Sequence, residues 1–234
     1  MEQIRNFGDK RQMAACVYCG FTTESRDHIP PKVFLDEPFP GNLHIVPACQ
    51  KCNIGNSLDE EYVVCLLECI TEGVESVENI SRQKIKYIFI QKPLLASRIF
   101  KTSVKTGTGV IFNIEMERAK RVILKLAKGH AAYELNEPQY NNPSKVTLIP
   151  LISLTPKDRE YFESYPKQNL LPEVGSRAMQ RMIVSSNDAI IPWTIVQPGR
   201  YRYLATVGHN VLVRLVINEY LACEVMWGEE ETLS

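Results

Sequence analysis

Hydrophobic and polar positions divide the chain into a polar, cysteine-rich start and a longer body with regular periodicity. Residues 15–57 contain only short apolar runs among many Cys, Pro, Gly and Asn residues. So short and polar a segment cannot build much of a core by itself, which indicates a small unit held together by metal. An apolar run then predicts a buried helix over about 58–70, which Gly73 is expected to end.

The clearest helix lies over residues 115–128, where apolar residues recur on one face. The face consists of Met116, Ala119, Ile123 and Leu126, and Gly129 stands where the helix is expected to end. Residues 146–153 predict a strand that Pro150 places at an edge or at a bulge. From residue 190 onward four apolar stretches separated by turn residues predict a run of β-strands. The pattern predicts an α+β protein, with a small metal module (1–57) followed by a larger mixed body (58–234) for substrate binding or assembly.

Composition limits the class of protein. The 234 residues are 44% hydrophobic and 23% charged, as expected of a packed globular chain with one or two domains. No apolar run approaches the roughly 20 residues that a membrane helix needs, and the first 13 residues contain no apolar export signal. We therefore expect a cytoplasmic protein with no membrane partner, whose seven cysteines are reduced thiols or metal ligands.

The zero net charge conceals an uneven distribution along the chain. Residues 1–80 contain six Lys or Arg against thirteen Asp or Glu, whereas residues 81–130 contain twelve against two. Within the basic segment, Arg121, Lys125 and Lys128 fall at helical spacing, opposite the apolar face of the predicted helix. These three side chains are candidates for contacts with nucleic-acid phosphates, although an ordinary solvated helix face explains the same pattern.

Two CxxC pairs provide the strongest chemical signal. Cys16 and Cys19 form the first pair, Cys49 and Cys52 form the second, and 29 residues separate the pairs. A CxxC loop presents two thiolates to one ion, so two such loops complete a tetrahedral zinc site. Because soft thiolates favour zinc over magnesium, the four cysteines predict a structural zinc.

The segment that contains both pairs and the residues between them resembles a known family. The residues CVYCG, then DHIPPK, then NLHIVPACQKCN resemble the HNH endonucleases in their zinc-stapled ββα-metal (treble-clef) form. The resemblance covers residues 16–56, under a fifth of the chain, and contains both pairs, the Asp27–His28 dipeptide, Asn42 and Asn53 in order. It departs from many members at Asn56 and Ser57, where those members place a basic residue.

The resemblance implies a role for each matching residue. His28 would be the general base that activates the attacking water, and Asp27 and Asn53 would ligate a catalytic Mg²⁺ or Mn²⁺. Asn42 would hold the loop of the ββ-hairpin and so orient the histidine. The residue types suit the chemistry, because an imidazole with a pKa near 6.5 can accept a proton and a hard cation on oxygen ligands can stabilise a leaving oxygen.

The spacing raises one geometric question, because neighbouring residues on a regular strand point to opposite faces. Asp27 and His28 therefore share one site only if the strand pairing breaks at them, and Pro30 and Pro31 are expected to end it there. Alone, an Asp-His dipeptide would more often be a turn cap and a surface imidazole. Between two CxxC pairs it favours the catalytic interpretation.

The sequence is compatible with two functions. The first is an HNH-type metal-dependent endonuclease that hydrolyses DNA, with RNA kept open as a substrate, in phage defence, restriction or a mobile element. Two-strand cleavage by a single-site nuclease would favour a homodimer. The alternative is a non-catalytic zinc module that binds nucleic acid or a protein partner. The presence of Asp27, His28 and Asn53 together favours the enzyme.

Overall fold

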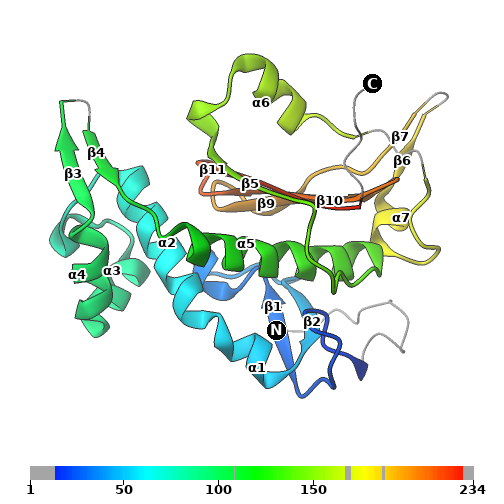
Figure 1. Cartoon of the computed structure of the whole chain (residues 1–234), viewed down its shortest axis with the longest axis horizontal. Helices are drawn as coiled ribbons and strands as arrows, with labels where there is room; N and C mark the ends of the chain where they lie inside the picture. Colours follow the sequence, from blue (N-terminus) through cyan, green and yellow to red (C-terminus); the bar gives the residue numbers. More distant parts are fainter. Residues whose placement is uncertain (1–13, 108, 167–169, 186–187, 229–234) are drawn as a thin grey trace. The chain divides into compact units, whose positions relative to one another are not determined.

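The computed structural model describes residues 14–107, 109–166, 170–185 and 188–228, and it mixes helices with strands as predicted (Figure 1). The packing divides the chain into two compact units, one of residues 1–55 with 123–234 and one of residues 56–122. The first division lies close to the predicted boundary after residue 57. The second places residues 123–234 in the same unit as the cysteine-rich start.

Five antiparallel strands form the main sheet of the first unit, in the order β5-β11-β10-β9-β8. Their bounds are Lys145–Pro150 (β5), Thr194–Gln197 (β8), Tyr201–Val207 (β9), Val211–Ile217 (β10) and Leu221–Trp227 (β11). The β-rich pattern predicted after residue 190 is confirmed. Among the described residues β5 pairs with β11 alone, so Pro150 lies on an edge strand, where its missing N–H costs no ladder bond.

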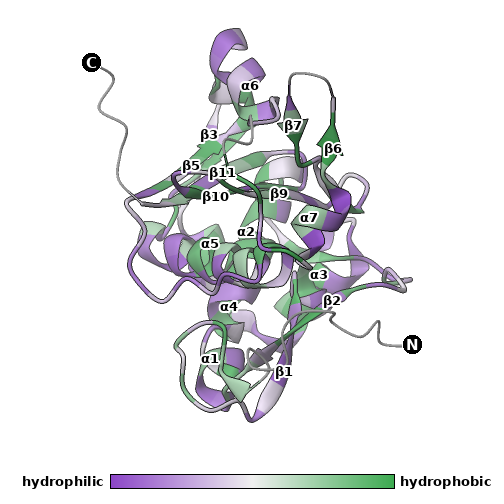
Figure 2. Ribbon diagram, turned by 90° about the vertical axis from the view of Figure 1, so that its right-hand side faces the viewer, coloured by the Kyte–Doolittle hydropathy of each residue, from purple (hydrophilic) through white to green (hydrophobic). Residues whose placement is uncertain are grey.

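Helix α6 (Pro156–Glu163) packs through Phe162 onto β10 and β11. In Figure 2 the ribbon of α6 is coloured mostly as hydrophilic residues and that of β10 mostly as hydrophobic residues. The buried Arg214 of β10 donates from Nη1 to the carbonyl oxygens of Tyr161, Phe162 and Ser164, and its Nε lies 2.8 Å from a carboxylate oxygen of Glu224. The guanidinium thus satisfies the last carbonyls of α6 and a carboxylate of the sheet.

The predicted helix at 115–128 is confirmed as α5 (Met116–His130), but it does not end at Gly129. It continues directly into a π-helical turn, Ala131–Leu135. The glycine serves close packing instead, because a Cβ at this position would lie 2.7 Å from Cδ1 of Ile29. His130 stacks on Tyr203 of β9 with ring centroids 3.7 Å apart, which seats the end of α5 on the sheet.

The cysteine-rich segment forms a β-hairpin and a short helix. β1 (Ser25–Ile29) pairs with β2 (His44–Ala48), and α1 (Gln50–Gly55) follows. In Figure 1 the last turns of α5 lie between this hairpin and the main sheet. One buried cluster joins the hairpin to the π-helical turn that follows α5: Cys16, Val17, Tyr18, Ile29, Val46, Ala48, Cys49, Ala132 and Tyr133. Smaller elements of the unit are η2 (Lys32–Phe34), η5 (Leu151–Ser153), α7 (Arg177–Arg181), β6 (Ile183–Val184) and β7 (Ala189–Ile190).

The second unit is mainly helical. It contains α2 (Ser57–Glu72), η3 (Val77–Asn79), α3 (Gln83–Gln91), α4 (Pro93–Phe100), the hairpin strands β3 (Ser103–Thr106) and β4 (Gly109–Phe112), and α5 up to Val122. Gly73 ends α2 with a φ of 64°, as predicted. Among the helices in the described part of the chain, none combines the length and the apolar character needed to cross a membrane.

Candidate metal centre and surrounding site

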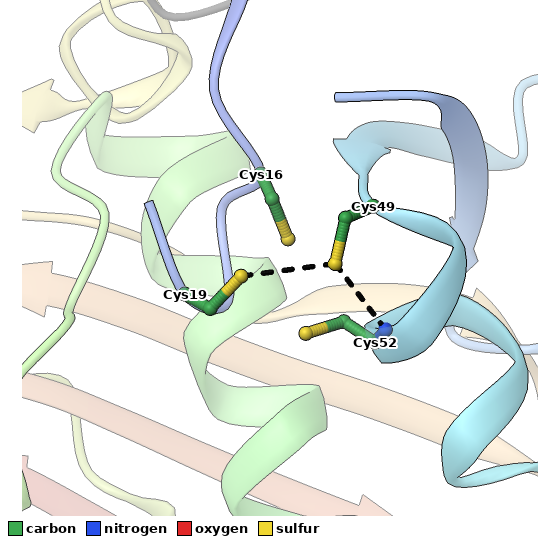
Figure 3. A group of neighbouring side chains, drawn as sticks. All are labelled: Cys16, Cys19, Cys49 and Cys52. Atoms are coloured by element: carbon green, nitrogen blue, oxygen red, sulfur yellow. Dashed lines mark hydrogen bonds between the residues drawn. The ribbon is translucent and has the colours of Figure 1, made fainter. Parts of the chain in front are cut away.

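Two loops bring the four predicted cysteine ligands together (Figure 3). Cys16 and Cys19 lie on a tight turn that the Gly20 amide closes by donating to the Cys16 carbonyl at 2.8 Å. Gly20 has a φ of 79°, a conformation that glycine adopts without strain. Cys49 lies just before α1 and Cys52 lies in its first turn, so the helix start presents the second pair.

The sulfur positions fit a zinc ion. All four ligand atoms lie within 4.8 Å of one another, and the Cys19 and Cys49 sulfurs are 3.7 Å apart. Tetrahedral coordination at a Zn–S distance of about 2.3 Å puts neighbouring sulfurs about 3.8 Å apart. The Cys52 amide donates to the Cys49 sulfur at 3.4 Å and lowers the pKa of that thiol to about 7. The predicted four-cysteine metal site is therefore present, with a donor set suited to zinc.

Lys128 lies beside the cysteine cluster. Burial lowers the pKa of its ammonium, while the neighbouring Cys52 and Cys19 oppose that shift. Its Nζ lies 3.5 Å from the carbonyl oxygen of Tyr140, a residue whose ring packs against the backbone of Gly20. The cation is therefore placed to offset the negative charge of four thiolates around one zinc.

Pairing within the hairpin fixes the directions of Asp27 and His28. Asp27 is opposite Val46 and His28 is opposite Ile45, and the register continues unbroken to Ile29. The expected break therefore comes after the dipeptide rather than at it. Because the pairing is regular through both residues, Asp27 and His28 point to opposite faces of the hairpin.

Asp27 is buried in a network of polar contacts. Its side chain is 8% exposed, and its Oδ2 accepts a hydrogen bond from the Tyr18 hydroxyl at 3.0 Å. The same oxygen lies 2.8 Å from the ammonium of Lys125, whose side chain is 4% exposed. Lys125 also lies 3.5 Å from the carbonyl oxygen of Asn53, on α1. An ammonium therefore stands between the strand and the helix that carry the two predicted cation ligands.

His28 is half-buried, and its Nδ1 has no hydrogen-bond partner in the described part of the chain. Burial and the charge of Lys32 lower its pKa, and the nearby Asp27 carboxylate and the His44 backbone only partly oppose this. The imidazole is therefore neutral at pH 7, which is the form that accepts a proton.

The two asparagines lie at different places. The Asn53 amide donates to Ser25 Oγ at 3.1 Å and to the Arg26 carbonyl at 3.2 Å, so it ties α1 to β1 beside Asp27. Asn42 lies at an exposed turn before β2. The structure thus brings Asn53 to the Asp-His strand and leaves Asn42 on the hairpin loop.

The three basic residues predicted to share an exposed face of α5 lie in different environments. Arg121 is exposed and pairs with Asp59, with Nη2 and Oδ2 2.8 Å apart. Lys128 is half-buried. Lys125 does not lie on a solvated face, because the hairpin and α1 cover the polar side of the helix at that turn. Periodicity alone cannot reveal this, since it shows only which face of the helix is apolar.

A buried polar network next to the hairpin is not evident from the sequence pattern. Tyr203 donates to Glu134 Oε1, which also lies 3.1 Å from Nη1 of Arg181. His44 of β2 stacks on Tyr133 and lies 3.1 Å from the Tyr203 hydroxyl through Nδ1. Burial, together with Arg177 and Arg181, lowers the pKa of His44 to about 3. This neutral histidine lies against Tyr203 of β9 and so ties β2 to the main sheet.

Comparisons with protein-family models, with curated proteins and with solved structures found no significant match. The geometry of the site is therefore the basis for assigning a function.

Proposed function

We propose that the chain is an HNH-type endonuclease that hydrolyses phosphodiester bonds in DNA, with a structural zinc on its four cysteines. One observation supports this above the others. The clustered cysteines flank the hairpin that carries Asp27 and His28, and Asn53 is hydrogen-bonded to the same strand. This scaffold holds the strand of the dipeptide at a fixed place, with Asp27 and His28 on opposite faces of the hairpin, so the proposed base and the proposed metal ligand act on one phosphate only if this pairing shifts.

His28 is the proposed general base. Its imidazole is neutral and half-buried, and its Nδ1 is buried with no hydrogen-bond partner in the described surroundings, so the ring must become exposed to accept the proton of a water molecule. The zinc contributes structure, because four thiolates fill its tetrahedral coordination and leave no position for water. Reduced thiols suit the cytoplasm, where we place the proposed role in defence, restriction or a mobile element.

The proposal also includes a Mg²⁺ or Mn²⁺ ion held by Asp27 and Asn53, since oxygen ligands are those that such cations take. The contacts of the described arrangement do not fit that ion. Oδ2 of Asp27 already accepts from Tyr18 and pairs with Lys125. A divalent cation at this carboxylate therefore requires Lys125 to move.

The first test is cleavage of plasmid DNA by purified protein with and without Mg²⁺ or Mn²⁺, beside the variant His28→Ala. We expect His28→Ala to lower the rate at least about 100-fold, the usual contribution of a general base, with unchanged zinc content and circular dichroism. The matched control is His209→Ala, an exposed histidine between β9 and β10, which should cleave like the parent. Equal rates for His28→Ala and the parent would place the base elsewhere.

A non-catalytic zinc module that binds nucleic acid or protein is the second candidate. The observation that favours it is the buried Asp27–Lys125 pair, which gives the carboxylate a structural partner. The plasmid cleavage assay distinguishes the two functions. A binding module shifts the mobility of DNA, or captures a protein, without cutting DNA under any cation.

A further inference from the structure

Lys125 occupies an unusual place for a lysine. It lies on α5 between Ile123 and Ala127, which are fully buried, and its own side chain is 4% exposed. An ammonium removed from water to this degree is costly unless a carboxylate and further hydrogen bonds compensate it. The carboxylate is that of Asp27, at 2.8 Å.

The surroundings of the ammonium are those that a metal cation would use. Its Nζ lies against an Asp27 oxygen from β1 and 3.5 Å from the Asn53 carbonyl oxygen at α1, with the Tyr18 ring centroid 5.4 Å away. A carboxylate, a carbonyl and an aromatic face all favour positive charge. In a site shielded from water, a second cation on the same carboxylate would be repelled strongly by the ammonium.

We propose that Lys125 is a resident counter-ion that competes with divalent cations for Asp27, so that a metal ion binds only as the ammonium withdraws. This inference rests on the proposed function for the identity of the metal ligands. It concerns which cation lies at the Asp27 carboxylate, whereas the proposed function concerns cleavage. The described state, with Lys125 in place, is then a resting state of the nuclease. The need to displace an internal cation makes the enzyme demand a high concentration of Mg²⁺ or Mn²⁺.

The test measures Mn²⁺ binding by calorimetry on the full zinc-loaded chain. Lys125→Met keeps most of the side-chain volume and removes the charge, so we expect it to bind Mn²⁺ at least about tenfold more tightly than the parent, a conservative figure for loss of a buried ion pair. Lys145→Met is the matched control, because Lys145 also pairs with a carboxylate, Glu224, but on the sheet. Lys125→Met with Asp27→Asn should lose the added affinity. Equal Mn²⁺ affinity in Lys125→Met and the parent would overturn the proposal.

A second measurement needs no substitution, which matters because Lys125→Met leaves Asp27 buried without its partner. Amine acetylation of the parent, read by mass spectrometry, should spare Lys125 without Mn²⁺ and label it once Mn²⁺ is added, while Lys145 reacts equally in both. Protection of Lys125 that Mn²⁺ does not change would also overturn the proposal. If Lys125→Met gains Mn²⁺ affinity while neither it nor the parent cuts nucleic acid, the endonuclease function fails and the competition stands. If the parent cuts nucleic acid but Lys125→Met gains no Mn²⁺ affinity, the competition fails and the endonuclease function stands.

Discussion

Gly129 is a residue at which the backbone of α5 closely approaches the hairpin. A Cβ placed there would lie 2.7 Å from both Cδ1 and Cγ1 of Ile29. Ile29 is fully buried within the cluster that joins β1, β2 and the end of α5, so it cannot move aside freely. The glycine therefore sets the distance between the helix and the strand that carries Asp27 and His28.

Gly129→Ala should lower the free energy of unfolding by about 1–2 kcal/mol. Overpacking of a tight core costs about 1–3 kcal/mol, and the better helix propensity of alanine returns up to about 1 kcal/mol. The matched control is Gly55→Ala at the end of α1, where a Cβ would meet nothing within 4 Å and stability should be equal or higher. Urea unfolding measures both variants. A Gly129→Ala protein as stable as Gly55→Ala would show that the helix and hairpin can move apart at no cost.

At the scale of elements, periodicity and turn residues are enough to predict α2, α5 and the strands after residue 190. They give no indication of strand β3, because Ser103–Thr106 is short and polar. The continuation of α5 past Gly129 depends on Ile29, a residue one hundred positions earlier. Local sequence contains no information on such a contact.

For the candidate site too, the sequence predicts local features but not contacts between distant segments. The spacing of the cysteines is enough to predict the metal site, since one ion must be reached by two short loops. The environments of Asp27 and Lys125 do not follow from spacing, because they arise where the hairpin packs on α5. Nor does the unbroken pairing through His28, since strand register depends on the partner strand.

Removal of zinc should affect more than the cysteine loops. We expect the parent to hold one equivalent of zinc and Cys52→Ser to lose it, as measured by elemental analysis. Hydrogen exchange should then rise in residues 16–52 and also at Ala132 and Tyr133, because all of these share one buried cluster. Cys65→Ser is the control, since Cys65 is buried in α2 outside the metal site and zinc should be retained.

Two results would contradict this prediction. Freshly purified parent protein without zinc would exclude the structural metal. Faster exchange confined to residues 16–52 in Cys52→Ser would show that the end of α5 keeps its structure without the hairpin.

At the scale of the whole molecule, the basic segment at residues 81–130 is the observation that supports the proposed nucleic-acid partner. Each phosphate contact on duplex DNA changes the logarithmic salt dependence of binding by roughly 0.9. Arg121→Ala and Lys128→Ala, tested one at a time, should each weaken binding to all sequences and lower that slope by up to about one. Lys145→Ala on β5 is the control. Binding measured by fluorescence anisotropy between 50 and 300 mM salt, as an approximate range, gives the slopes. Unchanged slopes in both variants would place the nucleic acid on another surface.

The division of the chain into units has a consequence for synthesis on the ribosome. Residues 56–122 are inserted between the hairpin and the helix end that covers it. The four cysteines are complete once Cys52 has emerged, but Ala132 and Tyr133 follow only about 80 residues later. At about 5–20 residues per second, the nascent hairpin waits about 4–16 seconds with Ile29 and Val46 uncovered. Zinc capture during this interval would keep the segment folded until its cover arrives, so scarcity of the metal during translation should reduce the yield of protein more than its later removal.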